Sequence, residues 1–242
     1  LGPVVDLDLN PSSPAIGRKG RSYARDPATV VAFARAFIGA HRKLGVLTAA
    51  KHFPGHGSAI GDSHDQPVDI SATWEDDELE PYRALIAADP PALVMVGHLT
   101  HPRFSDGDRP ASLSRRTLTE ALRRDLGFDG LIVTDDLGMG AVTRRYSVDE
   151  AAVMAIRAGA DLIIVANRER PDPDLAEHVI AAVVTAVAAG RIPASAIADA
   201  DRRILAARRA LVASRAAWGP PACMPSRSPA ASAEAETGAL LP

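Results

Sequence analysis

The sequence predicts an α/β fold built on parallel strands, and two features of its hydrophobic pattern support this. Short apolar runs alternate with longer amphipathic stretches, in the same order along the chain. The apolar runs are continuous and do not alternate with polar residues, which is typical of parallel strands covered on both faces. A chain of 242 residues with 47% hydrophobic residues can bury one sizeable core, so we expect a single α/β domain.

Five apolar runs are predicted to be strands. In chain order they are Gly2–Leu9, Val46–Ala50, Ala92–Gly97, Leu131–Thr134 and Leu162–Val165. Each run is short and is followed by polar residues before the next amphipathic stretch, as expected of repeated βα units.

Six stretches are predicted to be helices, because their apolar residues recur along one face. The first begins after Asp26, with proline in its first turn. The fourth opens at Ser147, where Glu150 completes a capping box. Apart from the fourth, the expected helices are Pro27–Lys43, Glu75–Ala88, Arg115–Asp125, Leu175–Ala189 and Ala194–Ala213. Gly190 lies between the last two.

From Ser214 onward, proline, alanine, serine and glycine replace the periodic pattern. A segment of this composition buries too little apolar surface to offset the entropy lost on folding. The sequence therefore predicts a folded domain over residues 1–213 and a disordered Pro/Ala/Ser-rich tail over residues 214–242.

Composition and charge argue against several classes of partner. The net charge is −3 and opposite charges are interspersed, so no basic face is predicted for nucleic acid or an anionic membrane. No run of about 18 apolar residues suggests a membrane span. The single cysteine, Cys223, excludes an internal disulfide and fits a reducing compartment. We expect a cytoplasmic monomer that acts on a small molecule, and a gene product that begins upstream of Leu1.

Ionisable residues collect directly after the predicted strands, where a sheet of parallel strands carries its functional loops. These groups are Asp6–Pro11 with Arg18–Arg21, Lys51–Gly57 with Asp62–His64, His98, and Asp135 with Asp136. Because the carboxyl ends of parallel strands meet at one edge, the groups are predicted to share one face. A uniform scatter of polar residues would seldom produce this arrangement, so it indicates a functional site.

One motif carries a specific resemblance. The residues Lys51-His52-Phe53-Pro54-Gly55-His56-Gly57 are followed, four residues later, by Asp62-Ser63-His64. This pattern resembles the signature of family 3 glycoside hydrolases, in the branch of β-N-acetylhexosaminidases that release N-acetylglucosamine. The segments that also fit the family are Pro3–Asp8, Ile16–Pro27 and Gly130–Met139, and the resemblance covers roughly Leu1 to Val212.

The resemblance implies a (β/α)8 barrel of the TIM type whose first strands are missing from this chain. It implies Asp135 as the catalytic nucleophile, and Asp62 with His64 as an acid/base pair. The substrate-binding positions that it implies are Arg21, Lys51 and His52. It implies no metal and no cofactor. The expected activity is retaining hydrolysis of terminal β-linked N-acetylglucosamine from glycans or peptidoglycan fragments, with a small carbohydrate as the partner.

The chemistry of a retaining glycosidase fits these roles. Such an enzyme needs a carboxylate below the anomeric carbon, which Asp135 can supply, and a proton donor at the leaving oxygen. A histidine side chain ordinarily titrates near pH ~6.5, and a neighbouring carboxylate such as Asp62 favours its protonated form and fixes its tautomer. His64 can therefore donate the proton and, once neutral, take one from water.

Two further expectations concern the loop that carries His64. A neutral base does not repel an anion, so transfer of the sugar to phosphate in place of water is conceivable. The glycines predicted to let this loop fold over the sugar are Gly55, Gly57 and Gly61.

Several residues also have a structural interpretation. Adjacent acids after a strand, such as Asp135 and Asp136, often lie in the first turn of the next helix, and for Asp136 we favour that role. His56 either shapes its loop or touches the substrate. Asp6 and Asp8 alternate along one predicted strand, so one of them is expected to point inward. The residues assigned no catalytic role are His98, as a hydrogen-bonding neighbour of the site, and Arg18 and Lys19, as solvated charges.

Three alternatives are open at this stage. A broader β-glucosidase or a glycoside phosphorylase of the same family would use the same residues. A metal hydrolase is disfavoured, because Phe-Pro-Gly between His52 and His56 prevents a helical His-x-x-x-His ligand pair. An inactive sugar-binding fragment is the third, because a complete barrel has eight strands and typically ~250 residues. The sequence does not distinguish muropeptides from chitin fragments as the natural glycan.

Overall fold

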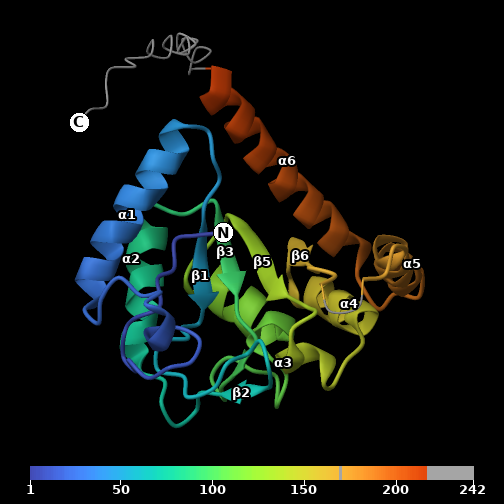
Figure 1. Ribbon diagram of the computed structural model, residues 1–242. Coiled ribbons are helices and arrows are strands. Elements are labelled where there is room, and N and C mark those ends of the chain that lie inside the picture. Colours follow the sequence, from blue (N-terminus) through green and yellow to red (C-terminus); the bar gives the residue numbers. More distant parts are fainter. Residues whose placement is uncertain (169–170, 217–242) are drawn as a thin grey trace, which may run out of the picture.

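The structure is a computed structural model that describes residues 1–168 and 171–216 (Figure 1). Its centre is a four-stranded parallel sheet in the order β1-β3-β5-β6, which is also the order along the chain. The strands are Ala49–Phe53 (β1), Leu93–Val96 (β3), Leu131–Asp136 (β5) and Leu162–Ile164 (β6). A smaller parallel pair consists of Val68–Asp69 (β2) and Leu99–Thr100 (β4). The predicted α/β class with a parallel sheet is confirmed.

The segment predicted as the first strand, Gly2–Leu9, follows the edge of β1 but does not form a strand. Val4 makes an isolated parallel bridge with Lys51, and the next residue donates its N–H to the Lys51 carbonyl oxygen at 2.7 Å. The carbonyl oxygens of Gly2 and Pro3 accept the N–H groups of Ala49 and Lys51, but Pro3 has no N–H to donate in return, so the ladder is incomplete. Beyond the bridge the pairing ends, and the Asp6 side chain instead binds the loop that follows β1.

Polar residues at the strand ends account for two shifted boundaries. The predicted strand Val46–Ala50 lies too early, because β1 continues through Lys51 and His52 to Phe53. In the same way β5 continues past Thr134 to Asp136. These polar side chains face the open carboxyl end of the sheet, so their polarity made strand residues resemble a loop.

The two best-marked helices begin where their caps predict. α1 spans Pro27–Lys43, and the Asp26 carboxylate accepts the N–H of Thr29 at 2.8 Å. α4 spans Val148–Ala158 and has the predicted capping box between the residue before it and Glu150. Both cap signals are local in sequence, which is why they were readable.

The predicted helix Glu75–Ala88 is divided in two. A 3-10 turn over Asp76–Leu79 precedes α2, which spans Glu80–Ala88. Pro81 lies in the first turn of α2, where its missing N–H costs nothing, and it favours a helix start at that point. The remaining elements are two 3-10 turns (Gly17–Lys19 and Ala111–Leu113), a wide π-type helix (Arg116–Asp125), α3 (Gly140–Thr143), α5 (Leu175–Ala188) and α6 (Ala194–Ala216).

Both faces of the sheet are covered, which explains why the strands read as continuous apolar runs. On one face Ala50, Val94 and Ile132 belong to the main core, together with buried residues of α1, α2 and α4. On the other face alternate strand residues form a second cluster, against which Ile204 and Ala207 of α6 pack. Figure 1 shows α1 and α2 together on one side and α6 running obliquely down the other side.

A buried carboxylate fastens α6 to the rest of the domain. Asp161, whose side chain is 1% exposed, forms ion pairs with Arg123 of the π-type helix and with Arg203 of α6. The same carboxylate accepts the backbone N–H of Ile132 at 2.8 Å. One acidic group before β6 therefore joins the central strand and two helices that are distant in sequence.

α6 continues to Ala216, past its predicted end at Ala213. The rest of the predicted disordered tail, residues 217–242, lies outside the described residues. Within the part that the structure describes, none of the helices is both long enough and apolar enough to cross a membrane.

The position of Ile132 at the centre of the sheet yields a stability test. Ile132 is 0% exposed, so Ile132→Ala leaves a cavity in the main core and should lower the free energy of unfolding by about 2–5 kcal/mol. Ile180→Ala, on α5, serves as the control because Ile180 is 60% exposed and its loss should change little. Urea denaturation followed by circular dichroism measures both, and equal stability of the two variants would contradict this core assignment.

Candidate functional site

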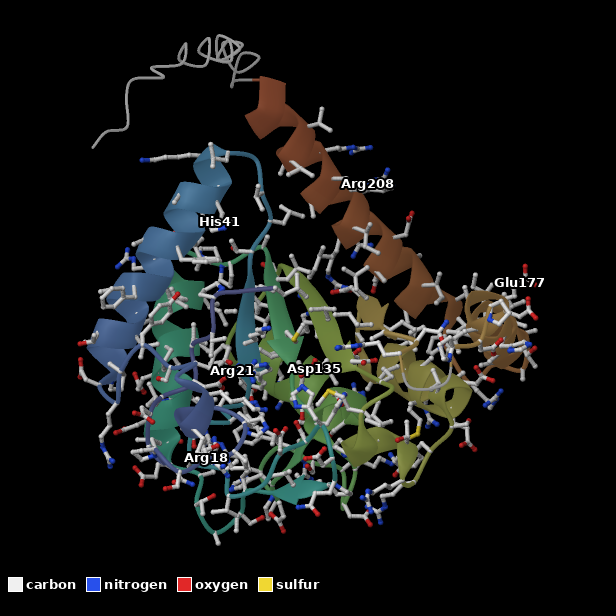
Figure 2. All side chains as sticks on the ribbon, in the orientation of Figure 1. Arg18, Arg21, His41, Asp135, Glu177 and Arg208 are labelled. Atoms are coloured by element: carbon white, nitrogen blue, oxygen red, sulfur yellow. The ribbon has the colours of Figure 1, made fainter. Side chains whose placement is uncertain are left out.

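The candidate site lies at the carboxyl ends of the strands, as the sequence predicts. β1 carries Lys51 and His52, and β5 carries Asp135. Arg21 comes from the segment before α1, and Figure 2 shows it close to Asp135 below the strands. Asp62 and His64 lie on the loop between β1 and β2. The structure therefore delivers the six predicted residues from separate segments to one end of the sheet.

Asp135 presents a half-buried carboxylate at the end of β5. Its Oδ1 accepts the N–H of Asp136 at 2.9 Å, and its side chain is 18% exposed. Burial raises the pKa of Asp135, but the neighbouring His52 and His98, the hydrogen bond from the Asp136 N–H and the Lys51 ammonium together hold this pKa below its ordinary value. The group is therefore an ionised carboxylate with an accessible edge, as a nucleophile requires.

The ring of His52 is held between an acid and a cation. Its Nδ1 lies 2.7 Å from Asp6 Oδ2, and its Nε2 lies 3.2 Å from Arg21 Nη2 and 4.0 Å from Asp135 Oδ2. A guanidinium has only donors, so Arg21 donates to an unprotonated Nε2 and the ring proton sits on Nδ1, facing Asp6. His52 thereby orients Arg21 beside the Asp135 carboxylate.

Asp6 is a site residue whose orientation the sequence left open. Its carboxylate is fully buried and accepts the backbone N–H groups of His52 at 3.1 Å and His56 at 2.9 Å, besides the His52 ring. Burial raises the pKa of Asp6, but attraction to His52 and hydrogen bonds from it outweigh burial, so the pKa is lowered. Of the alternating pair Asp6 and Asp8, Asp6 is the one that points inward to the site.

A second buried carboxylate holds the loop after β1. Glu78 accepts the Gly57 N–H at 2.9 Å and the Ser58 hydroxyl at 2.5 Å. Burial raises the pKa of Glu78 to about 7. A Cβ on Gly57 would lie 1.8 Å from the Leu7 carbonyl oxygen, and one on Gly55 would lie 2.6 Å from the Glu78 side chain. In this structure these two glycines allow close packing of the loop. The sequence-based expectation was that they let the loop fold over the sugar.

Asp62 and His64 form a hydrogen-bonded pair. Asp62 Oδ1 lies 2.6 Å from His64 Nδ1 and accepts the His64 N–H at 3.1 Å, while Oδ2 accepts Lys19 Nζ at 2.9 Å. Burial raises the pKa of Asp62, but the donors on Lys19 and His64 hold it well below its usual range. The His64 side chain is 54% exposed, and its Nε2 is the ring nitrogen left for proton transfer. Lys19, predicted to be a solvated charge, is a partner of this pair.

Backbone hydrogen bonds dock the loop of the pair onto the segment after Asp135. Gly140 N–H donates to the His64 carbonyl at 2.8 Å, and Ala141 N–H donates to the Ser63 carbonyl at 3.2 Å. The charge of His64 also contributes to lowering the pKa of His98, although burial is the main cause. The pair therefore lies within electrostatic reach of the end of β5.

The other imidazoles of the site have structural partners. His98 Nδ1 lies 2.6 Å from Ser112 Oγ and its Nε2 lies 2.8 Å from the Asp136 carbonyl oxygen, so His98 supports the end of β5. His56 Nε2 lies 3.2 Å from Ser63 Oγ, and burial lowers the pKa of His56 to about 4. Among residues 1–168 and 171–216, no three His, Cys, Asp or Glu side chains are grouped to hold a metal ion.

Lys51 and Asp136 complete the strand ends. Burial and the charge of Arg21 lower the pKa of Lys51, partly opposed by attraction to Asp135 and Asp6. Asp136 Oδ1 accepts the N–H of Gly138 and of Ala166, each at 2.9 Å, which fits the structural role expected of Asp136.

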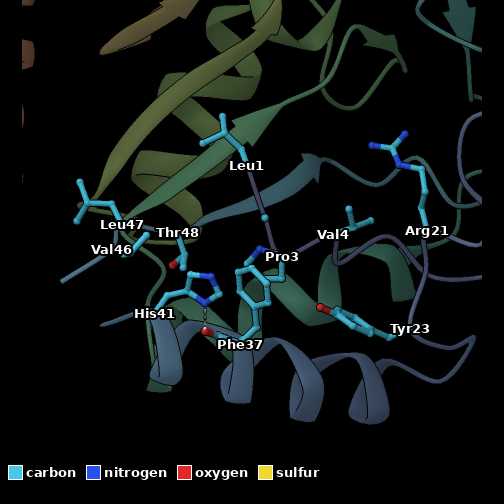
Figure 3. A pocket seen from close by; sticks show the side chains of 11 residues that line it. Leu1, Pro3, Val4, Arg21, Tyr23, Phe37, His41, Val46, Leu47 and Thr48 are labelled. Atoms are coloured by element: carbon cyan, nitrogen blue, oxygen red, sulfur yellow. Dashed lines mark hydrogen bonds between the residues drawn. The ribbon is translucent and has the colours of Figure 1, made fainter. Parts of the chain in front are cut away.

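A cavity of ≈ 580 Å³ adjoins the site on the side of the N-terminal segment (Figure 3). Arg21 lies at one end of it, and apolar side chains such as Phe37 line much of it. The Nδ1–H of the His41 ring donates to the Phe37 carbonyl oxygen at 2.8 Å, because a carbonyl oxygen can only accept. The cavity thus extends along the N-terminal segment at the β1 edge of the sheet, and of the six predicted residues only Arg21 lines it.

Fold and site together define a class: a parallel α/β domain with a carboxylate, imidazole rings and cations at its strand ends. Residues 1–207 match the family model described as the glycosyl hydrolase family 3 N terminal domain. The chain belongs to glycosyl hydrolase family 3.

Several relatives have informative names. Beta-hexosaminidase LpqI of Mycobacterium tuberculosis (strain ATCC 25618 / H37Rv) is 41% identical over 215 residues, which are 85% of this chain and 52% of the relative. The glycoside hydrolase family 3 beta-N-acetylglucosaminidase from Paenibacillus sp. str. FPU-7 superposes with a TM-score of 0.80 and 34% identity, over 87% of this chain and 39% of that one. Beta-glucoside phosphorylase BglX superposes with a TM-score of 0.77 and 29% identity, over 88% and 39%. The chain spans about half the length of the curated relatives it matches.

The docking of the His64 loop yields a second test. A Cβ on Gly140 would lie 2.2 Å from the Asp65 carbonyl oxygen, so Gly140→Ala should displace the loop. We expect faster hydrogen exchange at the amides of residues 140 and 141, and a loss of roughly 1–3 kcal/mol of stability. Gly39→Ala in α1 is the control, because nothing lies within 4 Å of its Cβ position. Unchanged exchange in Gly140→Ala would show that the docking is not tight.

Proposed function

We propose that this chain carries the catalytic site of a retaining β-N-acetylglucosaminidase. The observation that carries the proposal is the pairing of an ionised carboxylate, Asp135, with a hydrogen-bonded Asp62–His64 pair on a loop docked beside it. The relatives named beta-hexosaminidase and beta-N-acetylglucosaminidase support the substrate class.

In the first step Asp135 attacks the anomeric carbon and the bond to the leaving oxygen breaks. His64 Nε2 gives its proton to that oxygen, so the products are a glycosyl ester on Asp135 and a free alcohol. In the second step neutral His64 takes a proton from water, whose oxygen attacks the anomeric carbon and releases Asp135. Asp62 keeps the His64 ring in one orientation through both steps.

The sugar would be bound by donors around the nucleophile. Arg21 and Lys51 carry N–H groups suited to hydroxyl oxygens, and His52 sets the position of Arg21. The pKa of Lys51 is lowered, yet Lys51 faces the negative charge of Asp135, which favours its protonated form. These contacts hold the ring above the Asp135 carboxylate.

A glycoside phosphorylase is the second candidate, favoured by the similarity to beta-glucoside phosphorylase BglX. In that reaction phosphate would replace water, and a neutral His64 would not repel it as a carboxylate base would. Release of N-acetylglucosamine 1-phosphate in phosphate buffer, in place of the free sugar, would select this reaction.

We also propose that the sheet is part of a (β/α)8 barrel, with the site at the carboxyl ends of its strands. The incomplete pairing of the N-terminal segment with the edge of β1 and the apolar cavity along that segment support this arrangement. A small carbohydrate partner, a monomeric state and a cytoplasmic location remain predictions from the sequence.

The substrate class is tested with two aryl glycosides. A site that hydrogen-bonds the acetamido group should reject the hydroxyl analogue, so we expect faster release from the β-N-acetylglucosaminide than from the β-glucoside. Asp135→Ala should lower kcat by roughly 10³-fold or more, whereas Asp129→Ala, at an exposed position, should not. The assay is run on this chain and on a version extended upstream of Leu1. Comparable rates on both glycosides would favour a general β-glycosidase, and no turnover by either protein would oppose the enzyme proposal.

The acid role of His64 is tested with leaving groups of different basicity. His64→Ala should reduce the rate strongly for an alkyl glycoside, whose leaving oxygen needs a proton, and much less for a dinitrophenyl glycoside. Asp135→Ala should reduce both rates equally, since both substrates need the nucleophile. Steady-state kinetics give the two ratios, and similar behaviour of both variants on the activated substrate would reject this division of roles.

A further inference from the structure

Lys19 is a third member of the Asp62–His64 pair. Hydrolysis by an Asp–His pair does not itself require such a residue. Lys19 Nζ lies 2.9 Å from Asp62 Oδ2, while Asp62 Oδ1 receives both the ring and the backbone N–H of His64. The Lys19 side chain is 50% exposed, whereas that of Asp62 is 10% exposed. One largely buried carboxylate is therefore divided between two basic side chains.

A rigid turn delivers Lys19 to this position. Lys19 and Arg21 both donate their backbone N–H to the Ile16 carbonyl at 3.2 Å, and Gly20 between them has a φ of +57°. A Cβ on Gly17 would lie 2.4 Å from the Asn10 carbonyl oxygen, so the turn packs tightly on the preceding segment. The turn sends Arg21 toward the nucleophile and Lys19 toward the acid/base pair.

We propose that Lys19 is a positioning residue that sets the proton affinity of His64 by sharing the Asp62 carboxylate with it. The inference rests on the proposed function, because it assigns Lys19 to the acid/base step. A carboxylate paired with His64 alone would stabilise the imidazolium more strongly and make its proton harder to release. The positive charge of Lys19 offsets part of that attraction. A residue that must donate and then accept a proton in each cycle works best when neither form is strongly favoured.

Other titratable groups lie near the Asp62–His64 pair but interact with it less directly. His56 and His98 are buried rings that interact with Asp62 and His64 only through space. Asp65 is exposed, and Arg144 donates to its backbone carbonyl at 3.0 Å. Among the described residues, Lys19 is the cation that the structure places on the Asp62 carboxylate itself.

The test compares pH profiles of kcat/KM on an unactivated β-N-acetylglucosaminide. Lys19→Met removes the charge and keeps the stem, so the alkaline limb, where the acid loses its proton, should move upward by roughly 0.2 to 0.7 pH unit, as for a half-exposed ion pair. Lys19→Arg keeps the charge and should restore the wild-type limb. Arg18→Met is the matched control, because Arg18 lies on the same turn and is exposed. The alkaline limb of the Arg18→Met profile should stay near its wild-type position.

A readout without turnover separates this inference from the proposed function. Titration of the His64 ring by NMR should show the same upward shift in Lys19→Met whether or not the chain hydrolyses a glycoside. Higher salt should move the wild-type titration in that direction and leave Lys19→Met almost unchanged. A uniform loss of rate in Lys19→Met with both titrations unmoved would reduce Lys19 to a purely structural role. An equal shift in Arg18→Met would assign the effect to the general field of the turn, and either result overturns the proposal.

Discussion

The carboxylate of Asp6 is buried beneath the site and accepts hydrogen bonds from the backbone of His52, the backbone of His56 and the His52 ring. An ionised carboxylate in such a place is costly unless its oxygens are fully used, and here they are. Through these contacts the N-terminal segment fixes the end of β1 and the loop that follows. The ring orientation that Asp6 imposes on His52 also decides where Arg21 can lie, so the arrangement around Asp135 depends on it.

Glu78 makes similar contacts with the same loop, but its pKa is shifted in the opposite direction. Burial dominates at Glu78 and raises its pKa to about 7, with the charge of Asp6 adding to the rise. At Asp6 the neighbouring His52 outweighs burial and lowers the pKa. A protonated Glu78 relieves the repulsion between two buried acids while still accepting from the Gly57 N–H. The loop is thus held by one charged and one readily neutralised carboxyl group.

Local signals were predictable from the sequence and long-range pairings were not. The bounds of α1 and the capping box at Ser147 follow from residues within one helical turn. The site residues were found because ionisable groups follow four predicted strands, and because the motif of Lys51–Gly57 and Asp62–His64 resembles the signature of a known family. Asp6, Glu78 and Lys19 bind partners that lie 46, 21 and 43 residues away in the sequence. The hydrophobic periodicity of the sequence does not indicate which distant groups these side chains will contact. The first strand was wrong for a related reason, since an apolar run does not show whether its backbone finds a full ladder.

The two halves of the site have separate supports that meet at the turn before Arg21. Asp6 and His52 support the side of the site that holds Asp135, whereas the segment after β5 holds the loop of Asp62 and His64 through backbone hydrogen bonds. Arg21 and Lys19 leave the same short turn and reach one half each. Because the turn is fixed by its own hydrogen bonds, movement of either half relative to the other must break an interaction with one of these cations. The distance between Asp135 and His64 is therefore constrained by a segment that contains neither residue.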